Sequence, residues 1–177
     1  LKINMICSTH GPVWQKHLSD AIAVYDRLSS GKTEKGLVIC YGSMYGNTER
    51  MAEALAEGAA EAGMQKIVIH NLSVSETSFV LADVFRYDTL AIGSPTYNGG
   101  VFPLVEDFFA RLSERIVSNH KLGLFGGYTW SSQAVKKMMA YNEKMKMQLI
   151  DKTVEWKQGV SQDSLSRVKE LGRLLGE

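Results

Sequence analysis

The chain has 177 residues, of which 45% are hydrophobic and 22% charged, as in a soluble globular domain of ordinary size. Its 20 Lys and Arg residues and 19 Asp and Glu residues give a formal net charge of +1. This balance lacks the basic excess that nucleic-acid binding requires, so we exclude nucleic acid as a partner. No apolar run is long enough to span a bilayer, and no membrane association is expected.

Cysteine usage and the first residue bear on the origin of the chain. Only Cys7 and Cys40 occur, far apart and without a CxxC pair, so neither a disulfide framework nor a thiolate zinc site is expected. A reducing, cytoplasmic location is therefore predicted. The chain starts at Leu1 rather than at Met, and we expect it to be a fragment or a processed product.

From Gly36 onward, short β-type runs alternate with helical stretches, which predicts an α/β fold with a parallel sheet covered on both faces. The expected strands are 37–41, 66–72, 90–93, 122–125 and 153–160. Pro103 opens one of the helices, since its missing N–H costs nothing there, and apolar residues recur at helical spacing as far as Ile116. The other expected helices are 47–63, 76–85, 134–146 and 164–175.

The first 35 residues differ from this body. An apolar run at 3–7 is followed by a turn at His10-Gly11-Pro12 and by an expected helix over 15–28. Residues 29–36 are small and polar, which indicates an interdomain linker. Because this N-terminal segment, residues 1–35, is too short to fold alone, we expect a larger upstream domain to precede it. We also expect residues 3–8 to be disordered or to pair with another chain.

The first of three unusual loops, 43–48, lies between a strand and a helix. It combines the hydroxyls of Ser43 and Thr48, the amide of Asn47 and a glycine, a set of donors that can hold a phosphate at a helix N-terminus. No Lys or Arg occurs from Gly42 to Glu49, and the GxxxxGK[ST] motif of nucleotide triphosphatases is absent. The alternative is that this loop only caps the helix, and the loop alone leaves both interpretations open.

The other two loops, 94–100 and 126–132, follow the third and fourth expected strands. Tyr97 offers a flat face, and the Asn98-Gly99 peptide can flip because glycine accepts positive φ. Trp130 in a loop is more often a packing residue than a ligand contact, but three such loops at one sheet edge favour the ligand contact. A phosphate site beside aromatic faces suits a flat heterocycle with a phosphate tail, and FMN is the predicted cofactor.

These loops resemble the FMN-binding loops of flavodoxin-like domains. The resemblance covers about residues 36–177 and implies a doubly wound five-stranded parallel sheet of order 2-1-3-4-5 with helices on both faces. It implies the following FMN-binding residues: Ser43, Met44, Tyr45, Gly46, Asn47, Thr48, Pro95, Thr96, Tyr97, Asn98, Gly99, Gly127, Tyr128, Thr129, Trp130 and Ser131.

The first 35 residues carry a second resemblance, to a more specific family. Residues 6–14, together with Trp156 and residues 170–173, are similar to the corresponding parts of flavodiiron proteins, or A-type flavoproteins. The resemblance implies that residues 1–35 are the end of a metallo-β-lactamase-like domain plus a linker, and that 36–177 form the FMN domain. His10 matches one iron ligand of that family, but the HxExDH run is absent, so no metal site is expected within this chain.

The third loop departs from the family pattern, because Thr129 and Ser132 stand where the family has glycines. If either position needs positive φ, the loop is strained by about 1–3 kcal/mol or follows another path.

The predicted function is an FMN-dependent electron-transfer module of a flavodiiron oxygen or nitric oxide reductase. It would pass electrons from a small donor protein or a reductase, rubredoxin-like by resemblance, to a diiron centre present only in a full-length protein. A homo-oligomer is left open. The alternatives are a free-standing NAD(P)H:quinone reductase of flavodoxin-like fold, against which the first 35 residues argue, and a flavin-free interaction domain.

Overall fold

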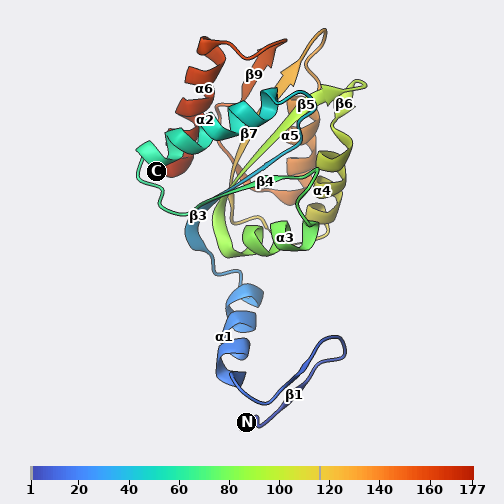
Figure 1. Cartoon of the computed structure of the whole chain (residues 1–177), viewed down its shortest axis with the longest axis vertical. Coiled ribbons are helices and arrows are strands. Elements are labelled where there is room, and N and C mark those ends of the chain that lie inside the picture. The colour runs from blue at the N-terminus through green and yellow to red at the C-terminus, as the bar shows by residue number, and fades with distance from the viewer. Residues whose placement is uncertain (1, 116) are drawn as a thin grey trace. The chain divides into compact units, whose positions relative to one another are not determined.

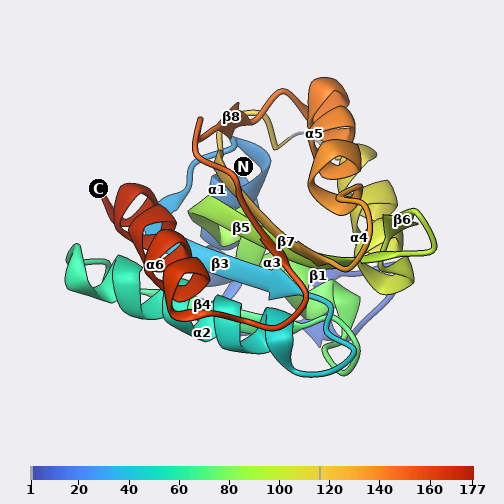
Figure 2. The same ribbon diagram turned by 90° about the horizontal axis from the view of Figure 1, so that it is seen from above.

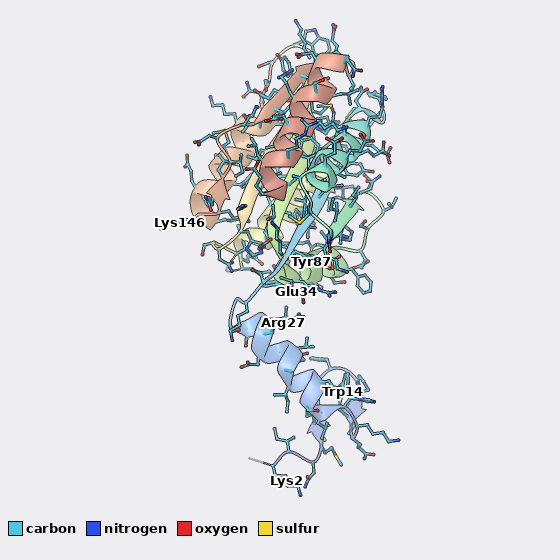
Figure 3. The ribbon with its side chains drawn as sticks, turned by 90° about the vertical axis from the view of Figure 1, so that its left-hand side faces the viewer. Lys2, Trp14, Arg27, Glu34, Tyr87 and Lys146 are labelled. Atoms are coloured by element: carbon cyan, nitrogen blue, oxygen red, sulfur yellow. The ribbon has the colours of Figure 1, made fainter. Side chains whose placement is uncertain are left out.

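The computed structural model describes residues 2–115 and 117–177. The chain divides into two compact units, Leu1–Thr33 and Glu34–Glu177, and each is described by itself. The expected boundary lies two residues later, after residue 35. The sheet begins earlier because Glu34, the first residue of strand β3 (Glu34–Tyr41), pairs with Tyr87, the first residue of β5 (Tyr87–Tyr97) (Figure 3).

The second unit is built on one central sheet with the strand order β4-β3-β5-β7-β8, in which β9 also pairs with β7. All of these pairings are parallel. The remaining strands of this sheet are β4 (Ile67–Asn71), β7 (Lys121–Tyr128), β8 (Gln148–Leu149) and β9 (Val154–Lys157). The predicted order 2-1-3-4-5 is confirmed, with the place of the fifth strand shared by the short segments β8 and β9 along β7.

Helices cover both faces of this sheet, as Figures 1 and 2 show. Helices α2 and α6 pack together on one face, and α3, α4 and α5 lie on the other. Their bounds are α2 (Asn47–Glu61), α3 (Thr77–Arg86), α4 (Pro103–Ser113), α5 (Ala134–Met145) and α6 (Gln162–Gly176). The predicted extension of the Pro103 helix to Ile116 falls on a residue outside those described.

The two faces follow from alternation along buried strands. In β3, Leu37, Ile39 and Tyr41 belong to the core beneath α2 and α6. Val38 and Cys40 belong to the core on the other face. Successive side chains of a strand point to opposite faces, so a run that is apolar at every position requires cover on both sides.

Two predicted loops begin as strands. Strand β5 continues through Ser94 to Tyr97, and β7 continues to Tyr128, so both strands run several residues beyond the predicted ends. Strand β5 then turns back on itself at Asn98-Gly99 and pairs antiparallel with β6 (Gly100–Val101). Strand pairing therefore fixes most of the second loop, which the sequence analysis placed after the end of the third expected strand.

The first unit holds a short hairpin and a helix. Strand β1 (Ile6–Cys7) pairs antiparallel with β2 (Val13–Trp14), and α1 (Leu18–Ser29) follows. The expectation that residues 3–8 are disordered or borrow another chain's edge is wrong at β1, because the turn at His10-Gly11-Pro12 folds the chain back and supplies the partner strand. No described residue of α1 is buried. Across the described parts of both units, no helix is long and apolar enough to cross a membrane.

Candidate functional site

A cavity of about 360 Å³ lies at the carboxyl ends of the central strands of the second unit. Its lining comes from the segments after β3, at the ends of β5 and β7, and in and after β9. The lining residues are Ser43, Met44, Tyr45, Asn47, Thr48, Pro95, Thr96, Tyr97, Asn98, Gly127, Tyr128, Thr129, Trp130, Trp156 and Gln158. The structure thus brings together all of the predicted site residues except Gly46, Gly99 and Ser131, which are not part of the lining.

The cavity lies where the order of the strands reverses. From β3 the chain moves outward to β4 and then returns to β5 on the other side of β3. The loops after β3 and β5 therefore leave the sheet in opposite directions and open a crevice between them. Ligands of doubly wound sheets bind in such a crevice.

The first wall of the cavity is the N-terminus of α2. Gly46 precedes the helix with a left-handed φ of 80°, and its N–H donates to Ser43 Oγ at 3.1 Å. No side chain described in the structure caps α2, whereas α6 is closed by a capping box between Ser161 and Ser164. The absence of a side-chain cap favours the phosphate interpretation of the 43–48 loop over the capping alternative, because the first-turn N–H groups of α2 have no side-chain acceptor.

A partly buried hydrogen bond joins the start of α2 to the end of β3. Tyr41 Oη donates to Glu49 Oε1 at 2.7 Å. Burial, together with the Glu49 carboxylate, raises the pKa of the Tyr41 phenol, so the hydroxyl keeps its proton and remains a donor. This contact fixes the direction in which the first turn of α2 leaves the sheet.

The second wall is a tight hairpin. Asn98 and Gly99 have positive φ values of 47° and 67° and connect paired residues Tyr97 and Gly100. Two such residues make the turn that matches the twist of a two-residue hairpin. Ser94 secures its base, because its Oγ accepts from Phe102 N at 2.9 Å and donates to Pro95 O at 2.9 Å.

Thr96 joins the second wall to the start of α5, which follows the third loop. Its Oγ1 accepts hydrogen bonds from the backbone N–H groups of Gln133 and Ala134, both at 3.2 Å. These bonds occupy the acceptor sites of the hydroxyl and leave its proton to be donated. Thr96 therefore caps α5 and presents one donor at the cavity.

Three aromatic side chains of the lining are exposed. Trp130 is 94% exposed, Tyr45 is 85% exposed and Tyr97 is 44% exposed. The Tyr97 ring contacts Phe102 edge to face, with 6.1 Å between the ring centroids. The general expectation that a loop tryptophan packs is wrong for Trp130, whose ring faces are free to cover a flat ligand.

The hydroxyl residues that replace family glycines in the third loop cause no left-handed strain. The described non-glycine residues with positive φ are His17, Asn98, Lys146 and Gln158, so Thr129 and Ser132 are not among them. The loop therefore accommodates both side chains in ordinary backbone conformations.

Sequence reasoning missed two lining residues, Trp156 and Gln158. Trp156 is 4% exposed, and its Nε1 has no hydrogen-bond partner. Gln158 has a left-handed φ of 62°, and its N–H donates to Tyr128 O at 2.7 Å, which holds the end of β9 against β7. A tryptophan in a strand usually belongs to the hydrophobic core, so the sequence around Trp156 did not indicate that it lines the cavity.

The described residues include no group of three or more His, Cys, Asp or Glu side chains that could hold a metal ion. His10 lies in the exposed turn of the first unit.

Comparison with known proteins places the fold and the site in a family. A nitric oxide reductase of Moorella thermoacetica is 33% identical over 98% of this chain, which spans 43% of that protein. The flavodiiron protein of Giardia intestinalis matches 99% of the chain with a TM-score of 0.90 and 29% identity, and the chain covers 44% of it. An archaeal flavodoxin has the same fold, with a TM-score of 0.71 and 22% identity over 80% of this chain and 96% of its own.

The fold and the cavity define a doubly wound α/β domain with a cavity at its switch point. The chain belongs to the flavodoxin family, whose model matches residues 39–170. Its relatives are flavodiiron proteins, and it spans about half, or somewhat less, of the length of the curated relatives that it matches. The cofactor of this family is FMN, and the open α2 N-terminus, the exposed aromatic faces and the free donors of the cavity fit a phosphorylated flavin.

Proposed function

We propose that the chain is the FMN-dependent electron-transfer module of a flavodiiron oxygen or nitric oxide reductase. In this role the flavin supplies the redox chemistry, and the chain binds it, orients it and sets its surroundings. Electrons would arrive from a redox partner and leave for a diiron centre held by another domain of the full-length protein.

The extent of the structural match carries this proposal. The flavodiiron protein of Giardia intestinalis matches 99% of the chain, so its likeness includes the hairpin and helix of the first unit. The archaeal flavodoxin matches 80%. A free-standing quinone reductase of flavodoxin-like fold would not require the first unit, and this favours the flavodiiron assignment over that alternative.

The residues divide the proposed FMN site into two ends. The phosphate would lie on the segment from Ser43 to Thr48, where the first turn of α2 offers uncapped N–H groups. The isoalloxazine would lie between Tyr97 and Trp130, with the Asn98-Gly99 peptide at its edge. Thr96 would donate its hydroxyl proton between these ends. This arrangement supports FMN rather than an unphosphorylated flavin.

The experiment is a titration of the flavin-free chain with FMN and with riboflavin. We expect FMN to bind more tightly, because riboflavin lacks the anion that the α2 N-terminus stabilises. Equal affinities would contradict the phosphate assignment, and failure to bind either flavin would favour the flavin-free interaction domain. Rapid NADPH oxidation with a quinone by the purified chain would favour the quinone reductase.

The partners follow from the same proposal. A rubredoxin-like donor or a reductase would deliver electrons, and two of the similar proteins carry such partners in their names, a flavorubredoxin of Escherichia coli and a rubredoxin oxygen oxidoreductase of Desulfovibrio gigas. The chain itself should hold flavin without stoichiometric iron, because His10 alone cannot hold a diiron pair. About two irons per FMN in the purified chain would overturn this part of the proposal.

A further inference from the structure

One buried donor in the cavity wall has no role in the fold. Among the side chains that the structure describes, Trp156 Nε1 is the single buried polar atom without a hydrogen-bond partner. The residue is 4% exposed. An indole N–H can only donate, and a buried donor without an acceptor costs free energy that a phenylalanine would avoid. An acceptor supplied by a ligand would remove that cost.

The neighbouring strand leaves room for the N–H edge of the indole. Trp156 in β9 pairs with Gly127 in β7, and both residues line the cavity. A Cβ atom at Gly127 would lie 2.8 Å from Cε2 and Cζ2 of Trp156 and 3.0 Å from its Nε1. The indole therefore occupies the space over Gly127 that a side chain would fill, and Trp156 and Gly127 together form this part of the cavity wall.

The donor lies on the same face of the sheet as α2 and α6. Trp156 belongs to the core shared with α2 and α6, together with Tyr41 at the end of β3 and Met51 in α2. The Asn98-Gly99 hairpin leads instead into Val101, which belongs to the core on the opposite face. The donor thus lies on the side of the sheet that carries the uncapped α2 N-terminus.

A phosphate at the N-terminus of α2 needs hydrogen-bond donors in addition to the backbone N–H groups. The described lining contains no Lys or Arg, so an anion there must be held by neutral N–H and O–H groups. Hydrogen bonds to a charged acceptor are stronger than those between neutral groups, and a low local dielectric strengthens them further. We propose that the Trp156 indole donates a hydrogen bond to the phosphate of the bound flavin nucleotide and is a determinant of the preference for FMN over riboflavin.

This inference rests on the proposed FMN site, and its test separates the two. The three tryptophans, Trp14, Trp130 and Trp156, give indole N–H signals in a ¹H–¹⁵N spectrum, and Trp156→Phe assigns one of them. In the wild-type chain we expect inorganic phosphate and FMN to move the Trp156 indole proton downfield, and riboflavin to leave it nearly in place. An equal shift with riboflavin, or no shift with inorganic phosphate, would overturn the inference even if FMN binds.

Affinity provides a second readout. In Trp156→Phe the ratio of riboflavin to FMN dissociation constants should fall roughly tenfold, because a hydrogen bond to a charged group is lost while the ring contacts remain. Trp14→Phe, in the first unit, is the matched control and should keep the wild-type ratio. An unchanged ratio in a folded Trp156→Phe chain would contradict the assignment. If that variant does not fold, Trp14→Phe and Trp130→Phe assign the other two signals, and the wild-type spectra then decide the inference from the third. Absence of FMN binding by the wild type counts against the proposed function alone.

Discussion

Gly58 in α2 lies directly against the carbonyl oxygen of Lys169 in α6, and a Cβ atom at Gly58 would be 2.0 Å from that oxygen. The contact is reciprocal, because a Cβ at Gly172 in α6 would lie 2.1 Å from the carbonyl oxygen of Leu55 in α2. Backbones this close leave no freedom for α2 to shift along α6. The crossing therefore sets where the N-terminus of α2 meets the cavity.

Gly58→Ala should destabilise the chain by about 1–3 kcal/mol, although alanine normally favours a helix. The added methyl group would meet the backbone of α6 rather than a side chain that can move. Urea unfolding measures the effect. Ala60→Ser, at an exposed position of the same helix, should cost no more than about 0.5 kcal/mol. A Gly58→Ala chain of wild-type stability would show that the two helices can separate without cost.

Thr48→Val should weaken FMN binding by about 1–3 kcal/mol, because a charged acceptor would lose one donor. Thr48 is 2% exposed and lines the cavity at the start of α2, and valine keeps its shape. Calorimetric titration measures the change. Riboflavin, which has no phosphate, serves as the control ligand and should bind with nearly unchanged affinity. Equal losses for both flavins would show that Thr48 does not act on the phosphate.

Gly99→Ala should destabilise the hairpin by about 1–3 kcal/mol through backbone strain alone. Gly99 has a φ of 67°, and a Cβ there would meet nothing within 4 Å, so no clash contributes. Gly159→Ala is the matched control, since it also has open space but no left-handed φ. We expect denaturant unfolding to separate the two variants and flavin affinity to fall only in the first. Similar stability of both would mean that the Asn98-Gly99 turn readily adopts another conformation.

Trp130→Ala should weaken FMN and riboflavin to the same extent, by at least the roughly 0.5–1.5 kcal/mol that aromatic stacking contributes. Because Trp130 is 94% exposed, the free energy of unfolding of the flavin-free chain should hardly change. Phe79→Ala, which removes a 70% exposed ring from α3, should alter neither flavin's affinity. Fluorescence titration with both flavins provides the comparison. Retention of wild-type affinity in Trp130→Ala would remove this ring from the site.

Glu155→Gln should stabilise the chain at pH 7. Partial burial in β9 raises the pKa of the Glu155 carboxyl above its ordinary value, so the folded chain disfavours the ionised form. Stability of the wild type should therefore fall as pH rises from the unfolded pKa through the raised folded one, and the advantage of the glutamine variant should shrink on acidification. Unfolding curves between about pH 4 and pH 7 test this, with the exposed Glu143→Gln as a control. A pH-independent difference would contradict the assignment.

The sequence predicted the parts of the fold that depend on local pattern. Alternating apolar runs and helical periodicity located the elements of the sheet, and clustered Ser, Asn and Gly residues located the cavity. The sequence pattern could not predict which segments that are far apart in the chain pair with each other. The Asn98-Gly99 pair is a strong hairpin signal. However, β6 is only two residues long, and it is a strand only because its residues pair with Thr96 and Tyr97 of β5. Trp156 is a core residue of β9, and it also enters the cavity wall because Gly127, which lies beside it, has no side chain.

The cavity lining extends in sequence from Ser43 to Gln158 and draws on the segment after β3 and on β5, β7 and β9 with the residues that follow them. No single segment of the chain holds more than one wall of the site, because parallel strands must pair over long separations before their ends meet. We therefore expect a ligand that contacts all of these walls to bind only after the sheet has formed. It binds the finished sheet and lowers the free energy of the native state, so its effect should fall on the rate of unfolding rather than on the rate of folding. We therefore expect a bound flavin to lengthen the lifetime of the folded domain more than it speeds folding.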